Sequence, residues 1–197
     1  MGLQKYPYSQ GSAIKLYGLN AQGVCWELCR RWVAGRLAGT WKVGESIWDE
    51  DKGKASFVDL LAEHKQRSTF TEANKSIAKL DHQTSRRRTM GTRKFKGLRS
   101  RADVINYVCA VPGAYIFIMT GKGSSGHAMA FDSRGQEELY FFDPNQGEWA
   151  FSGDALGAIG QWWSKFWDAS TDGDGAYDYK TAFHEGEREL VRYDTAI

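Results

Sequence analysis

The chain has 197 residues, of which 42% are apolar and 14% aromatic, including eight tryptophans. This composition supplies a substantial core and excludes an intrinsically disordered protein. The length predicts a single domain spanning residues 1–197. The net charge is only +2, and no specific nucleic-acid partner is predicted.

The absence of targeting patterns and the small number of cysteines exclude further classes of protein. No apolar run reaches the roughly 18 residues that a membrane span needs, and Met1–Gln10 lacks the pattern of a cleaved Sec signal peptide. Three cysteines are an odd number, which excludes a full disulfide framework and favours a reducing compartment. The scattered histidines and the cysteine spacing predict no metal site.

Helical patterns dominate the first half of the chain. Residues 1–20 read as an extended lead-in. A helix is predicted from Gly23 or Val24 to about Leu37, because apolar side chains recur at helical spacing. Shorter helices are predicted over residues 57–63, 71–80 and 101–109. Residues 85–100 have the weakest signal for regular structure.

The second half changes to the pattern of strands. Strands are predicted over residues 114–120, 126–132, 137–142 and 148–151, and the short turns between them imply an antiparallel meander. An aromatic amphipathic helix is predicted over 154–169, and a closing pair of strands over 177–184 and 189–193. Helices first and an antiparallel sheet afterwards make an α+β fold.

The charge is unevenly distributed. The segment Arg86–Arg101 carries eight Lys or Arg residues and no acid, whereas residues 135–179 carry nine acids and one base. A solvated loop is one interpretation of the basic segment. The other is a docking strip for an anionic partner, such as an acidic protein, an anionic membrane surface or nucleic acid.

Cys25 is the candidate nucleophile, because it is predicted to stand at the start of the first long helix, directly after Gly23-Val24. Unpaired backbone N–H groups and the positive end of the helix dipole favour a thiolate there. The alternative, true of most cysteines, is a small buried apolar residue. We expect that role for Cys29, one turn deeper, and for Cys109.

His127 is the candidate general base. It follows a Gly/Ser turn and precedes Ala-Met-Ala-Phe, so its small neighbours let the ring approach another backbone. The alternative is an ordinary strand histidine that faces solvent. The other three histidines, His64, His82 and His184, lie in polar surroundings.

Asp143 is the candidate orienting acid, at the end of an apolar strand and before Pro144-Asn145. Asp-Pro-Asn is also a good turn, so a plain turn aspartate is the alternative. A carboxylate at the strand end would accept from the histidine ring and fix its tautomer. Asn20, or alternatively Gln22, could donate to a developing oxyanion beside the Cys25 backbone N–H.

With these residues identified, the chain resembles the YopT-type cysteine proteases, papain-like effector enzymes of bacterial pathogens and plant symbionts. The matching segments are Gly23–Cys25 with Leu28 and Trp32 downstream, His127–Ala130, and Asp143–Glu148. The resemblance implies a papain-like α+β fold, with N-terminal helices packed on a central antiparallel sheet and the nucleophile at a helix start. It implies that Cys25, His127 and Asp143 are catalytic, that Asn20 is the oxyanion donor, and that no metal or cofactor takes part.

The resulting hypothesis is a cysteine endopeptidase that acts as a bacterial effector or toxin on a protein substrate in a host or rival cell. It would be secreted without a cleaved Sec signal and delivered into the reducing cytoplasm of the target cell, with a cognate immunity or chaperone protein as a further partner. Two alternatives use the same triad: a glutamine deamidase or transglutaminase-like toxin, and a cell-wall amidase.

Overall fold

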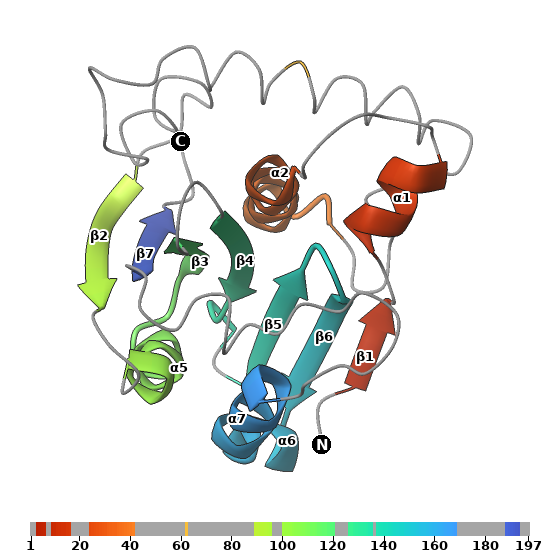
Figure 1. Cartoon of the computed structure of the whole chain (residues 1–197). Coiled ribbons are helices and arrows are strands. Elements are labelled where there is room, and N and C mark those ends of the chain that lie inside the picture. The colour runs from red at the N-terminus through yellow and green to blue at the C-terminus, as the bar shows by residue number, and fades with distance from the viewer. Residues whose placement is uncertain are drawn as a thin grey trace.

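The computed structural model describes residues 3–6, 9–16, 24–41, 62, 89–95, 100–120, 126–135, 137–168 and 188–193. Within these ranges the chain forms a seven-stranded antiparallel sheet in the order β1-β6-β5-β4-β3-β7-β2 (Figure 1). Helix α2 lies on one face of the sheet, and α5, α6 and α7 lie on the other (Figure 1).

The centre of the sheet is the predicted meander. Its strands are β3 (Ala114–Thr120), β4 (Gly126–Asp132), β5 (Glu138–Asp143) and β6 (Gly147–Ser152). Each pairs with the next, so the four predicted strands and their antiparallel order agree with the structure. Alternating β-branched and aromatic side chains between short turns account for this agreement.

The outer strands depart from the sequence prediction. Strand β7 (Arg188–Tyr193) was expected, but it lies between β3 and β2, and residues 177–184 lie outside the described residues. Strand β2 (Thr89–Phe95) falls within the segment predicted to have the weakest structure, so that prediction was wrong. It forms one edge of the sheet, where natural proteins place charged residues because they discourage further pairing.

The lead-in prediction was also wrong in part. Strand β1 (Leu3–Tyr6) is extended and pairs with β6, but α1 (Gln10–Leu16) is a helix of seven residues. Ser9 caps this helix, because its hydroxyl accepts from the Ser12 N–H at 3.3 Å.

The longer helices follow their predicted ranges. They are α2 (Cys25–Ala38), α5 (Ser100–Ala110), and α6 (Asp154–Gly157) with α7 (Ile159–Asp168), which divide the single helix predicted over 154–169. Gly39 ends α2 with a left-handed backbone, φ 67°, which costs glycine little. The helices predicted over 57–63 and 71–80 lie outside the described residues, apart from Ala62, which is helical.

Two cores cover the two faces of the sheet. On one face α5 and α7 pack against aromatic side chains of β3 to β6, with Trp163 between Phe117, Phe131 and Phe141. On the other face the buried side chains of α2 pack on the small residues Ala128 and Ala130 of β4. Small residues on that face let α2 approach the sheet closely.

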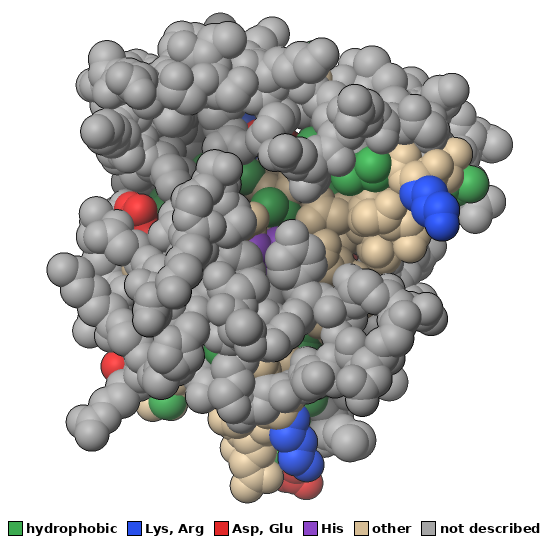
Figure 2. Space-filling view, in the orientation of Figure 1, with side chains coloured by type: hydrophobic (Ala, Val, Ile, Leu, Met, Phe, Trp, Pro, Cys, Tyr) green, Lys and Arg blue, Asp and Glu red, His purple; other side chains and the backbone are tan. Residues whose placement is uncertain are grey.

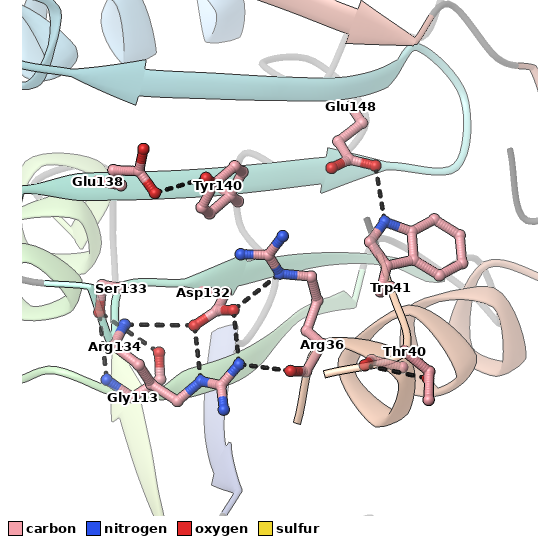
Figure 3. Close-up of polar contacts among 11 residues, drawn as sticks. Arg36, Thr40, Trp41, Gly113, Asp132, Ser133, Arg134, Glu138, Tyr140 and Glu148 are labelled. Atoms are coloured by element: carbon pink, nitrogen blue, oxygen red, sulfur yellow. Dashed lines mark hydrogen bonds and ion pairs between the residues drawn. The ribbon is translucent and has the colours of Figure 1, made fainter. Parts of the chain in front are cut away.

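An ion cluster fastens the end of α2 to the end of β4 (Figure 3). Asp132 accepts from Arg36 Nε at 2.8 Å and from Arg134 Nε at 2.9 Å, and Arg134 also donates to the Arg36 carbonyl at 2.7 Å. The Arg36 guanidinium stacks over the Tyr140 ring at 3.7 Å. Helix α2 therefore has a fixed position along β4.

No helix in the described part of the chain is long and apolar enough to cross a membrane.

Candidate active site

Cys25 is the first residue of α2, as the sequence predicted. Val24 precedes it as the N-cap residue and provides no side-chain cap, so the positive end of the helix dipole acts near the thiol. The thiol is partly accessible, whereas Cys29 is fully buried one turn further along the helix.

His127 and Asp143 meet where β4 and β5 separate. The backbone pairing of these strands covers Ala130–Asp132 of β4 and Tyr140–Phe142 of β5. Beyond that point β4 continues back to His127 and β5 continues on to Asp143. Their side chains join across the separation, with His127 Nε2 at 2.9 Å from Asp143 Oδ1.

The direction of this hydrogen bond fixes the histidine tautomer. A carboxylate can only accept, so Nε2 carries the proton and Nδ1 is the ring nitrogen left to interact with a thiol. The Cys25 thiol lies within hydrogen-bonding reach of the His127 ring. The structure therefore brings together Cys25, His127 and Asp143, which come from three separate segments of the sequence.

Asp143 is also a turn residue. Its Oδ1 accepts from the Asn145 backbone N–H at 2.8 Å, and its carbonyl accepts from the Gln146 N–H at 3.1 Å. Gly147 closes the turn with φ 109°, a region that glycine enters without strain. The Asp-Pro-Asn segment thus forms the turn that the sequence offered as an alternative, and the same carboxylate oxygen also contacts His127.

Burial and charge act in opposite directions on His127, whose side chain is only 2% exposed. Burial alone would lower its pKa, but the Asp143 carboxylate beside it and the Cys25 thiol raise the pKa to about 10. A ring with this pKa can accept the proton of the neighbouring Cys25 thiol at neutral pH, and Asp143, which is fully buried, would hold the resulting positive charge in place.

The other two cysteines have different surroundings. Burial raises the pKa of Cys29 well above its usual value, and the nearby Cys25 and Asp143 raise it further, so Cys29 is an inert core residue as predicted. Cys109 is exposed on α5, which contradicts the prediction that it is part of the core. Partial burial of its thiol nevertheless raises its pKa.

Asn20 and Gln22, the two candidate oxyanion donors, lie outside the described residues. Sequence reasoning missed Gln10, whose buried side chain contacts both Val24 and Asn145. Residues 1–20 read as extended, so no local pattern predicted the helix α1 that places Gln10 beside Val24 and Asn145. On the face of the molecule drawn in Figure 2, a small histidine surface lies near the centre, beside hydrophobic side chains.

Comparisons with known proteins agree with this arrangement. Residues 5–180 match the Peptidase C58 family, described as Yersinia/Haemophilus virulence surface antigen. Comparison with curated protein sequences finds no match. The structure is similar to the crystal structure of the Pseudomonas avirulence protein AvrPphB, with a TM-score of 0.58 and 14% identity. The similarity covers 87% of this chain and 93% of that chain.

These findings confirm the α+β, papain-like fold that the sequence predicted, since the similarity to AvrPphB extends over most of both chains. The family match covers far more than half of the sequence and confirms the resemblance stated from the three short segments. The chain belongs to the Peptidase C58 family, the YopT-type cysteine proteases.

Proposed function

We propose that this cysteine protease cuts a protein substrate with Cys25 as nucleophile, His127 as general base and Asp143 as orienting acid, within one catalytic domain spanning the chain. The observation that carries the proposal is the buried His127 ring, which bonds Asp143 through Nε2 and reaches the Cys25 thiol. A thiol hydrolase requires a nucleophile, a base that contacts it and a third group that orients the base.

The reaction proceeds in two halves. His127 takes the Cys25 proton, and the thiolate attacks the carbonyl carbon of a peptide bond. When the C–N bond breaks, the His127 imidazolium gives its proton to the leaving amine, and a thioester remains on Cys25. His127 then takes a proton from water, and the resulting hydroxide displaces the thiolate and releases the new carboxylate.

The oxyanion formed in each half needs donors. The Cys25 backbone N–H at the start of α2 is one, because its position at the helix N-terminus suits a developing negative charge. We propose the Asn20 side-chain amide as the second, with Gln22 as its alternative, since both precede the nucleophile by a few residues.

We further propose that the enzyme works as an effector or toxin inside a target cell. The virulence description of the family supports this. A reducing cytoplasm would keep the Cys25 thiol free, as an active thiol hydrolase requires. A cognate immunity or chaperone protein in the producing cell stays a prediction.

The basic segment Arg86–Arg101 is proposed to dock an anionic partner. Its central part forms β2, which β7 and β3 separate from β4 and its His127. Replacing Arg86, Arg87 and Arg88 with Gln should therefore weaken cleavage of the full target most at low salt, because salt screens charges over roughly 8 Å at physiological strength. Cleavage of a short peptide should barely change. An equal loss on both substrates, or no loss on either, contradicts docking.

The catalytic proposal is tested by comparing target-cell lysates treated with the wild-type protein and with Cys25→Ala. New peptide termini that require Cys25 support a protease, whereas a mass gain of about 1 Da on glutamine without cleavage supports a deamidase.

Asp143→Asn should reduce turnover by about 10²-fold or more in a folded protein. Near-normal turnover would leave Asp143 as a turn residue alone.

A further inference from the structure

Gln10 is a buried polar residue that the mechanism above does not use. It is the first residue of α1 and is 6% exposed. Its side-chain Oε1 accepts from the Val24 backbone N–H at 2.9 Å, and its Nε2 donates to Asn145 Oδ1 at 2.8 Å. Its own backbone N–H donates to the Pro144 carbonyl at 2.7 Å. One residue thus holds the segment before Cys25 against the turn after Asp143.

The orientation of the Gln10 amide follows from its partners. A backbone N–H can only donate, so Oε1 must face Val24 and Nε2 must face Asn145. An apolar side chain at this position would remove the acceptor of the Val24 N–H and the contact with Asn145 together. Val24 is fully buried, which makes an unpaired N–H at that position costly.

Gln10 completes a closed series of contacts around the site. Cys25 contacts His127, and His127 bonds Asp143 Oδ1. The same oxygen accepts from the Asn145 N–H, and Asn145 Oδ1 accepts from Gln10. Gln10 then accepts from Val24, the residue covalently joined to Cys25. The thiol and the carboxylate are thereby held from both directions, through the imidazole and through Gln10.

We infer that Gln10 is a positioning residue, which fixes the start of α2 relative to the Asp143–Gly147 turn and so sets the approach of the Cys25 thiol to His127. This inference rests on the proposed function of the three catalytic residues. Groups that hold a reacting pair matter because a misplacement of about 1 Å can reduce rate by about 10²-fold.

The test uses Cys25 alkylation, which needs no identified substrate. The second-order rate constant with iodoacetamide is measured between pH 5 and 10 by peptide mapping, with the exposed thiol of Cys109 as the reference in each sample. Gln10→Met keeps the volume of the side chain and removes both polar contacts. Gln161→Met on the exposed surface of α7 is the matched control.

For Gln10→Met we expect the Cys25 rate at pH 7 to fall between about 10- and 100-fold relative to Cys109. The pH profile should change from a plateau across neutral pH, where the protonated His127 ring faces the thiol, to a curve that rises continuously toward alkaline pH. Gln161→Met should match the wild type. A Gln10→Met protein with the wild-type rate and profile overturns the inference, whatever its melting temperature.

A second set of variants covers the case in which Gln10→Met does not fold. Gln10→Glu still accepts from Val24, and Asn145 can rotate its amide to donate to it; Asn145→Asp still accepts from Gln10. Each single variant should therefore keep the plateau, whereas the double variant places two carboxylates together and should lose it. A double variant with the wild-type profile refutes the inference. If wild-type Cys25 itself reacts no faster than Cys109, the proposed function fails instead.

Discussion

Helix α2 and strand β4 run in the same direction and are joined at both ends. At one end Cys25 contacts His127, and at the other Arg36 bonds Asp132 (Figure 3). The two intervals have equal length, since eleven residue steps of about 1.5 Å in a helix and five of about 3.3 Å in a strand both give about 16.5 Å. Replacing Asp132 with Asn perturbs the far attachment while leaving the size of the side chain unchanged.

The cost of this replacement can be worked out from the contacts. The Asp132 side chain is 3% exposed and accepts four hydrogen bonds, from Arg36 Nε, from Arg134 Nε and Nη2, and from the Arg134 backbone N–H. Removing one partner of a buried ion pair costs about 3–5 kcal/mol. The Arg134 side chain is 32% exposed and can regain water, which reduces the expected loss to about 2–3 kcal/mol.

Thermal unfolding followed by circular dichroism measures this loss. For a chain of this size about 2–3 kcal/mol corresponds to a decrease in Tm of roughly 5–10 °C at pH 7. Glu138→Gln is the matched control, because Glu138 is exposed and bonds only the Tyr140 hydroxyl among its described contacts. Its Tm should stay within about 2 °C of the wild type.

The pH dependence has a definite sign. Burial alone would raise the pKa of Asp132, but hydrogen bonds and charge from Arg134 and Arg36 hold it below its usual value. A carboxyl with a lower pKa in the folded state contributes stability above its unfolded pKa of about 3.9, and loses it as the pH falls through the folded value. The gap between wild type and Asp132→Asn should thus be complete at pH 5–7 and shrink below pH 4. A Tm decrease under about 1 °C, or a gap that widens in acid, refutes this reasoning.

Two other outcomes are expected. At pH 6.5 Cys25 should react with iodoacetamide before Cys29 or Cys109, even though Cys109 is exposed. The reason is that burial raises the pKa of the other two thiols, whereas the protonated His127 ring faces Cys25. Peptide mapping that finds Cys109 labelled first contradicts this expectation. Trp163→Ala should destabilise the fold by about 3–5 kcal/mol in chemical denaturation, because its buried ring packs against four phenylalanines. A cost under about 1 kcal/mol would show that the cavity collapses.

The parts of the fold that the sequence predicted are those with local signals. Strand β3 and strand β4 have the predicted bounds, because alternating apolar residues end at Gly/Ser segments. The start of α2 was also predicted, from a glycine followed by apolar residues at helical spacing. These signals need no knowledge of distant contacts.

The parts that the sequence did not predict depend on distant partners. Strand β2 contains glycine and several basic residues, and it becomes a strand by pairing with β7, almost a hundred residues later. Helix α1 is seven residues long and would be marginal alone. It is held by the contacts of Gln10 with Val24, Pro144 and Asn145, which no short window of sequence contains.

A single oxygen of Asp143 makes the contacts expected of a turn residue and those expected of a catalytic acid. Oδ1 accepts both from the Asn145 N–H and from His127 Nε2, so the turn aims the oxygen at the ring. An asparagine would keep that oxygen and both hydrogen bonds, and would lose only the charge that supports the protonated ring. The turn therefore explains why the carboxylate is in position, and the charge explains what it does there.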